Sequence, residues 1–121
     1  MNAQTARLLQ EAGVDLVDAE SRFSGDEELF LSIVSLYLDD AHAGELSRAI
    51  ERDDATSAFK SAHALKGAAG NLSLAQLHEA ASATCELLRE GNLAAARESM
   101  PKLEAAHARA VRALEKLGSA R

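Results

Sequence analysis

Apolar residues recur at helical spacing along most of the chain, and the pattern is clearest near its centre. The apolar positions there, at intervals of four, three, four and three residues, are Ala58, Ala62, Leu65, Ala69 and Leu72. This spacing aligns the five side chains in one stripe along a helix, facing a core. We predict that this central helix ends around Asn71, because asparagine tolerates the left-handed conformation common at helix C-termini.

Similar spacing predicts three further long helices. The helix before the central one runs to about Glu51, with an apolar side formed by Phe30, Ile33, Val34, Tyr37, Ala41, Leu46, Ala49 and Ile50. The helix after it presents Leu74, Leu77, Ala81, Thr84 and Leu88. The last presents Met100, Leu103, His107, Ala110, Leu114 and Leu117. Long helices joined by short turns pack antiparallel, which predicts an all-α, up-down-up-down four-helix bundle.

Polar residues mark where these helices begin. Ser24 with Glu27 three residues later predicts a capping box, and residues 73–76 predict a second one. A tight turn at residues 52–54 precedes the central helix, which Asp53 or Asp54 would cap.

The last helix has its own boundary signals. Gly91 ends the preceding helix and Asn92 caps the last one, and Pro101 is expected to kink it because proline removes a backbone donor.

The N-terminal region predicts two shorter segments. Residues 4–12 carry helical apolar spacing and stop at Gly13, and a short helical turn then ends near Phe23. We expect these segments to form a lid on one end of the bundle.

Composition supports a single domain over residues 1–121. Apolar residues make up 47% of the 121 residues, but there are only three Phe, one Tyr and no Trp. A core of small aliphatic residues suits close helix packing.

Charge and cysteine content exclude several classes. A net charge of -6 argues against nucleic acid or an anionic membrane surface as a partner. No apolar run is long enough to span a bilayer. Cys85 is the only cysteine, so we expect a reducing, cytoplasmic setting and a buried thiol.

His63 is the candidate functional residue of the central helix. It lies about 100° around the helix from the buried Ala62, where the apolar stripe meets water. Its neighbours on that flank are Lys66, Gly67 and Gly70. Each glycine costs a helix about 1 kcal/mol relative to alanine, which indicates space kept clear for a partner surface. Periodicity alone favours an alternative, in which the small residues pack on another helix and the histidine is half-buried.

The string His63-Ala64-Leu65-Lys66-Gly67 resembles the HxLKG signature of histidine-containing phosphotransfer (HPt) domains. Residues 23–29 are similar to that family's entry to its first long helix. Further matching positions are Val34, Tyr37, Leu46, Ala49 and the helix-start residue Asp54. The resemblance covers about residues 13–117. One departure is Leu72-Ser73, where the family usually has Leu-Gly.

The resemblance implies that His63 is phosphorylated by a receiver-domain aspartyl phosphate or a kinase, and that it relays the group to another receiver. Lys66 would offset the phosphoryl charge, with Lys60 adding to the field. The residues expected around the docking surface are Thr56, Phe59, Lys60, Ala64, Gly67 and Gly70. The domain would be a phosphotransfer intermediate rather than an independent enzyme, since no ATP-binding loop is present.

The implied partners are receiver domains of response regulators or a hybrid sensor kinase. The chain itself would act as a monomer and bind no cofactor, with Mg²⁺ held by the receiver.

Three other classes remain open at this stage. One is a non-catalytic helical interaction module, the second a degenerate domain that binds receivers without chemistry, and the third a metal-binding bundle. The last would need several convergent ligands, and no such set is apparent. We interpret His42 as a surface residue without a partner, and His107 as a core histidine with a local hydrogen bond.

Overall fold

The computed structural model describes residues 2–119, and of residue 119 only the backbone. Residues 1, 120 and 121, the ends of the predicted domain, lie outside the described residues. The described part forms helices α1 (Ala3–Ala12), α2 (Leu16–Phe23), α3 (Glu27–Leu38), α4 (His42–Glu51), α5 (Ala55–Asn71), α6 (Ala75–Arg89) and α7 (Leu93–Ser119). The prediction of an all-α fold is confirmed.

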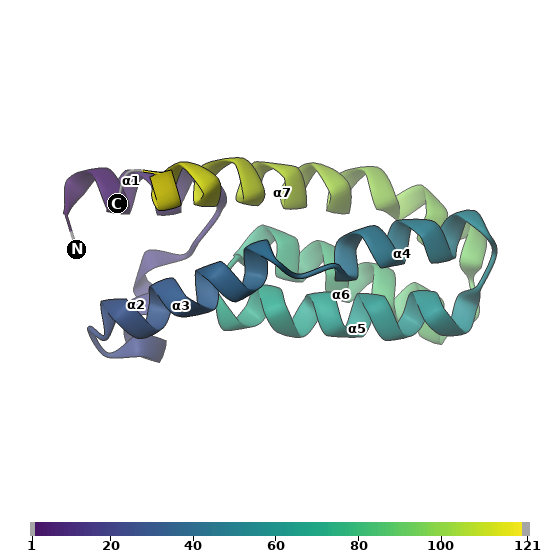
Figure 1. Cartoon of the computed structure of the whole chain (residues 1–121). Coiled ribbons are helices and arrows are strands. Elements are labelled where there is room, and N and C mark those ends of the chain that lie inside the picture. Colours follow the sequence, from purple (N-terminus) through teal and green to yellow (C-terminus); the bar gives the residue numbers. More distant parts are fainter. Residues whose placement is uncertain (1, 120–121) are drawn as a thin grey trace.

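The last four helices run side by side in alternating directions (Figure 1). Helix α5 packs against α4 and α6, and α7 packs against α6 and α4 on the opposite side. Connections of three residues join α4 to α5, α5 to α6 and α6 to α7. Such short connections favour antiparallel packing of consecutive helices. Helix α5 therefore has two helical neighbours and one outward surface.

The predicted apolar stripe of α5 forms the centre of the core. Its five residues, Ala58, Ala62, Leu65, Ala69 and Leu72, are all buried. Facing them are buried leucines of α6 and α7, including Leu77, Leu103 and Leu114, and the predicted buried Cys85. Because three of the five stripe residues are alanines, neighbouring helices can approach α5 closely.

The helix predicted to run to about Glu51 is divided in two after Leu38. The carboxylate oxygen Oδ1 of Asp40 accepts a hydrogen bond from the backbone N–H of His42 at 2.7 Å and lies 2.6 Å from its ring Nδ1. Aspartate side chains compete with helical hydrogen bonds in this way, which explains the break. The interpretation of His42 as partnerless was therefore wrong, although its side chain is 41% exposed.

Two predicted capping boxes are also wrong, and both involve a serine. Ser24 ends α2 in a left-handed conformation (φ 49°), while Asp26 caps α3 by accepting from the Leu29 N–H at 3.0 Å. Ser73 is likewise left-handed (φ 55°), and Leu74 precedes α6 without a side-chain cap.

The other predicted boundaries agree better with the structure. Asp54 caps α5 by accepting from the Ser57 N–H at 3.0 Å, and Asn92 caps α7 by accepting from the Ala95 N–H at 3.0 Å. Helix α5 ends at Asn71, but the left-handed residue of that turn is Ser73 rather than Asn71. Pro101 lies inside α7 without ending it.

Only α2 occupies the position predicted for a lid. Helix α1 instead packs along α7, where the Arg109 guanidinium donates to the backbone carbonyls of Gln10 and Glu11. Helix α2 lies against the turn between α5 and α6, because the Asp15 N–H donates to the Ser73 carbonyl at 2.8 Å. This hydrogen bond places the start of α2 beside the C-terminal end of α5.

His107 is half-buried and bonded across the bundle rather than locally. Its Nδ1 lies 2.6 Å from the hydroxyl of Tyr37, a residue of α3. Burial lowers the pKa of His107, opposed by the charge of Asp40, and burial also raises the pKa of Tyr37. We assign the neutral imidazole as acceptor of the Tyr37 hydroxyl.

This pair predicts a loss of stability on acidification. The pKa of His107 is about 6.5 in the unfolded chain and lower in the folded one, so the unfolded state binds more protons as the pH falls. We expect the urea midpoint to decrease from about pH 7 to about pH 5, and to decrease less in the variant His107→Leu. Equal pH dependence of the two proteins would contradict this assignment.

Candidate functional site

His63 lies on the outward surface of α5, with its side chain exposed between buried neighbours. Ala62 before it and Leu65 after it are buried, so the helix cannot rotate to cover the imidazole. Thr56 and Gly70, seven residues to either side, lie within about 20° of His63 around the helix axis. This line of residues, together with Gly67, is called the docking face below.

The imidazole of His63 is stacked on an aromatic ring. The centroids of the Phe59 and His63 rings are 6.1 Å apart, with 17° between their planes. On α6, the guanidinium carbon of Arg89 lies 5.6 Å from the Phe59 centroid, within the range of a cation–π contact. Arg89 also pairs with Glu86 at 3.0 Å. Phe59 thus restricts the histidine ring on one side and is itself covered by a cation.

Two lysines of α5 flank the histidine on different sides. Lys66 is half-buried and lies seven residues after Phe59, within about 20° of it around the helix axis. Lys60 lines a hollow toward α4 together with Glu45, Arg48 and Arg52. No ion pair involves either lysine among residues 2–119. No acidic side chain of the described residues therefore pairs directly with either lysine.

The two glycines assigned the same role have different surroundings. A Cβ atom at Gly67 would meet nothing within 4 Å, so that position faces open space. A Cβ atom at Gly70 would lie 3.3 Å from the ring carbon Cδ2 of His78 on α6. The space beside Gly70 is thus already occupied by a side chain of the same domain.

The remaining predicted docking residues lie around His63 without contacting it in any hydrogen bond of the described chain. Thr56 is exposed and Ala64 is half-buried. They add small, uncharged surface beside the imidazole, which leaves the approach to it unobstructed.

Sequence reasoning missed Arg89, although a signal for it exists. Two contacts between α5 and α6 are Phe59 with Arg89 and Gly70 with His78. In both pairs the residue numbers add to 148, as expected for antiparallel helices joined by a three-residue turn. Counting symmetrically from that turn would have brought Arg89 beside Phe59.

Among residues 2–119, no three His, Cys, Asp or Glu side chains are grouped so that they could hold a metal ion. No helix in this described part is both long and apolar enough to cross a membrane.

The structure is thus a helical protein that presents an exposed histidine, His63, on the outward surface of a helix. A family model described as the Hpt domain matches residues 32–114, which is more than half of the chain. The chain therefore belongs to the Hpt domain family. Searches of curated proteins and of solved structures found no match.

Proposed function

We propose that His63 accepts a phosphoryl group from the aspartyl phosphate of a receiver domain, or from a kinase, and passes it to another receiver. Family membership supports a histidine phosphotransfer role in phosphorelays. The observation that carries the assignment to His63 is its exposed ring beside the open position Gly67.

The proposed reaction exchanges one phosphorus bond for another. A neutral ring nitrogen of His63 attacks phosphorus, the bond from phosphorus to the aspartate oxygen breaks, and the carboxylate leaves with that electron pair. The imidazole loses its other ring proton to solvent. Such transfers depend mainly on positioning and charge stabilisation, so Mg²⁺ on the receiver would supply much of the catalysis.

This chain would contribute orientation and positive charge. Stacking on Phe59 limits rotation of the His63 ring, and a restricted nucleophile loses less freedom on reaching the transition state. Lys66, one helical turn from His63, would offset charge on the phosphoryl group. Lys60 would add to the same field, whereas Arg89 of α6 is paired with Glu86 and contacts Phe59.

The proposal includes a monomeric domain that meets its partners one at a time. Receiver domains or a hybrid sensor kinase would dock on the outward surface of α5. A non-catalytic module would bind the same partners without becoming labelled, which separates it from the proposed function.

The direct test is a phosphotransfer screen against the receiver domains of the source organism. Each receiver is loaded with radioactive phosphate and mixed with the full chain, and the label on the chain is followed with time. We expect at least one receiver to transfer its label within minutes, in an acid-labile form. Receivers that bind but never transfer would support the non-catalytic alternative instead.

We expect the variant Lys66→Ala to fold and to transfer phosphate about tenfold more slowly, which corresponds to about 1.4 kcal/mol of barrier. Arg89→Ala should have a smaller effect, because its guanidinium lies over the Phe59 ring and is paired with Glu86. Rates are measured at low salt, since screening would hide the effect.

A matched control for the lysine is Lys102→Ala, which removes an exposed lysine from α7. Its rate should equal that of the unmodified chain. Equal rates for Lys66→Ala and Lys102→Ala would contradict the assigned role of Lys66.

A further inference from the structure

A polar hollow lies where α2 meets the turn between α5 and α6, beside the docking face. It has a volume of about 190 Å³, and the residues that matter for its chemistry are Asp15, Asp18, Arg22, Gly70, Ser73 and His78. We call it the α2 hollow. Gly70 belongs both to this hollow and to the docking face.

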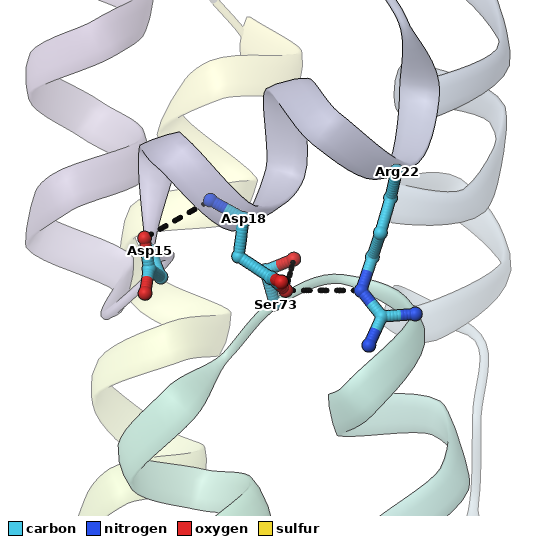
Figure 2. A network of polar contacts seen from close by, with 4 residues as sticks. All are labelled: Asp15, Asp18, Arg22 and Ser73. Carbon is cyan, nitrogen blue, oxygen red and sulfur yellow. Dashed lines mark hydrogen bonds and ion pairs between the residues drawn. The ribbon is translucent and has the colours of Figure 1, made fainter.

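Helix α2 is held in place by a small network centred on Asp18 (Figure 2). The Ser73 hydroxyl donates to Asp18 Oδ2 at 2.6 Å, and Arg22 Nε donates to the same oxygen at 2.9 Å. Both contacts lower the pKa of Asp18, the Ser73 hydrogen bond most strongly. Ser73 is buried, so the anchor of the network is fixed within the bundle.

The network leaves hydrogen-bond acceptors unused. Both donors bind Oδ2 of Asp18, while Asp15 uses its Oδ1 to accept from the Asp18 N–H at 3.1 Å. Within residues 2–119, the second oxygen of each carboxylate has no hydrogen bond to a protein donor. Two carboxylates and one guanidinium give the hollow an excess of one negative charge.

The hollow lies close enough to His63 to be covered by a partner that docks there. Gly70 lies seven residues beyond His63, about 10 Å along the helix axis at 1.5 Å per residue. A standard interface covers about 800 Å² on each partner, equivalent to a round footprint with a radius of about 16 Å. A receiver centred on His63 would therefore also cover the hollow.

We propose that the α2 hollow receives a lysine or arginine side chain of the receiver that docks on His63, and so contributes to partner selection. This inference rests on the proposed function. A cationic side chain fits because it would donate to an unused carboxylate oxygen of the hollow and balance the excess charge. Charge complementarity of this kind mainly sets partner choice and association rate.

The test uses the receiver with the fastest transfer in the screen and the double variant Asp15→Asn, Asp18→Asn. Asparagine keeps the shape and one acceptor oxygen of each side chain, but it replaces the other oxygen by an NH2 donor and removes the charge. We expect KM for the phosphorylated receiver to rise about tenfold while kcat stays within about twofold. The difference should shrink at about 1 M salt, where the screening length is about 3 Å.

Three further variants separate charge from structure. Asp15→Asn alone keeps a side-chain cap on α2 and should raise KM by a smaller factor. Ser73→Gly removes the hydroxyl but no charge, and should change KM less than the double variant. Glu115→Gln removes an exposed carboxylate from α7, away from α5, and should leave KM unchanged.

Each exposed lysine and arginine on the receiver is then changed to alanine in turn. One of these changes should raise KM with the unmodified chain and have little effect with the double variant. An unchanged KM in the double variant, or the absence of any coupled receiver residue, would overturn the inference.

Labelling with phosphoramidate, a small phosphoryl donor, separates failure of this inference from failure of the proposed function. The double variant should be labelled on His63 as fast as the unmodified chain. If receivers transfer phosphate normally but KM does not depend on the two carboxylates, only the α2 hollow assignment is wrong. If neither phosphoramidate nor any receiver labels His63, the proposed function itself is wrong.

Discussion

A glutamine at Gly67 is expected to leave the domain folded and to slow phosphotransfer from receivers by at least about a hundredfold. The position faces open space, because a Cβ atom there would meet nothing within 4 Å, so a longer side chain has room to leave the helix without a clash at its base. Replacing a helical glycine should even stabilise α5, by up to about 1 kcal/mol. The same side chain would stand between the receiver and His63 and prevent the close approach that transfer requires.

Gly70→Gln provides a structural comparison for this variant. Its added side chain would meet the His78 ring, so we expect a lower melting temperature than for Gly67→Gln. Gly67→Ala, the small-residue control, should melt no lower than the unmodified chain and should retain transfer. A large loss of melting temperature in Gly67→Gln would show that this position does not face a partner.

Docking and chemistry can be separated with the same variants. Phosphoramidate is small enough to reach His63 past a glutamine, so it should label Gly67→Gln at a nearly normal rate. Loss of labelling from both phosphoramidate and receivers would mean that the substitution damages the histidine rather than the docking face.

His63→Gln is expected to abolish phosphoryl acceptance completely while the domain remains folded. Its side chain is exposed, and within residues 2–119 its one aromatic contact is the stack on Phe59, so little stability depends on it. Glutamine retains a polar side chain of similar length but has no nucleophilic ring nitrogen. Label on the variant after incubation with a phosphorylated receiver is the quantity to measure.

The other histidines serve as controls for this result. Substitution of His42 or His107 by glutamine should leave labelling by receivers intact, and His78→Gln should leave labelling by phosphoramidate intact, since none of the three lies on the exposed line of α5. His107→Gln should lower stability through loss of its contact with Tyr37. Acid-labile label on His63→Gln would contradict the assignment.

The helices and the candidate histidine could be predicted because their signals are local. The five-residue stripe of α5 is buried as its spacing requires, and the same spacing exposes His63. Asp54 and Asn92 were recognisable as caps because a cap contacts backbone only three residues away.

Contacts between distant residues could not be predicted in this way. Ser73 has the sequence context of a cap, but its hydroxyl binds Asp18, which is 55 residues away. The family commonly has a glycine at this position. In this chain Ser73 stands there and adopts a left-handed conformation. A serine can adopt it here because the hydrogen bond to a carboxylate offsets the backbone cost.

For the docking face too, positions along one helix could be predicted from the sequence, whereas contacts with another helix could not. Sequence spacing placed Gly67 and Gly70 on one flank of α5, which the helix geometry requires. It could not show that His78 of α6 fills the space beside Gly70, nor that Arg89 covers Phe59. Both contacts depend on the register between two helices.

Locating the phosphoryl group is the most direct test of the central claim. The unmodified chain is mixed with a phosphorylated receiver, digested at neutral to alkaline pH and analysed by tandem mass spectrometry that preserves the phosphorus–nitrogen bond. We predict one modified peptide, with the phosphoryl group on His63. A phosphoryl group on any other residue, or a chain that binds the receiver and is never modified, would contradict the account.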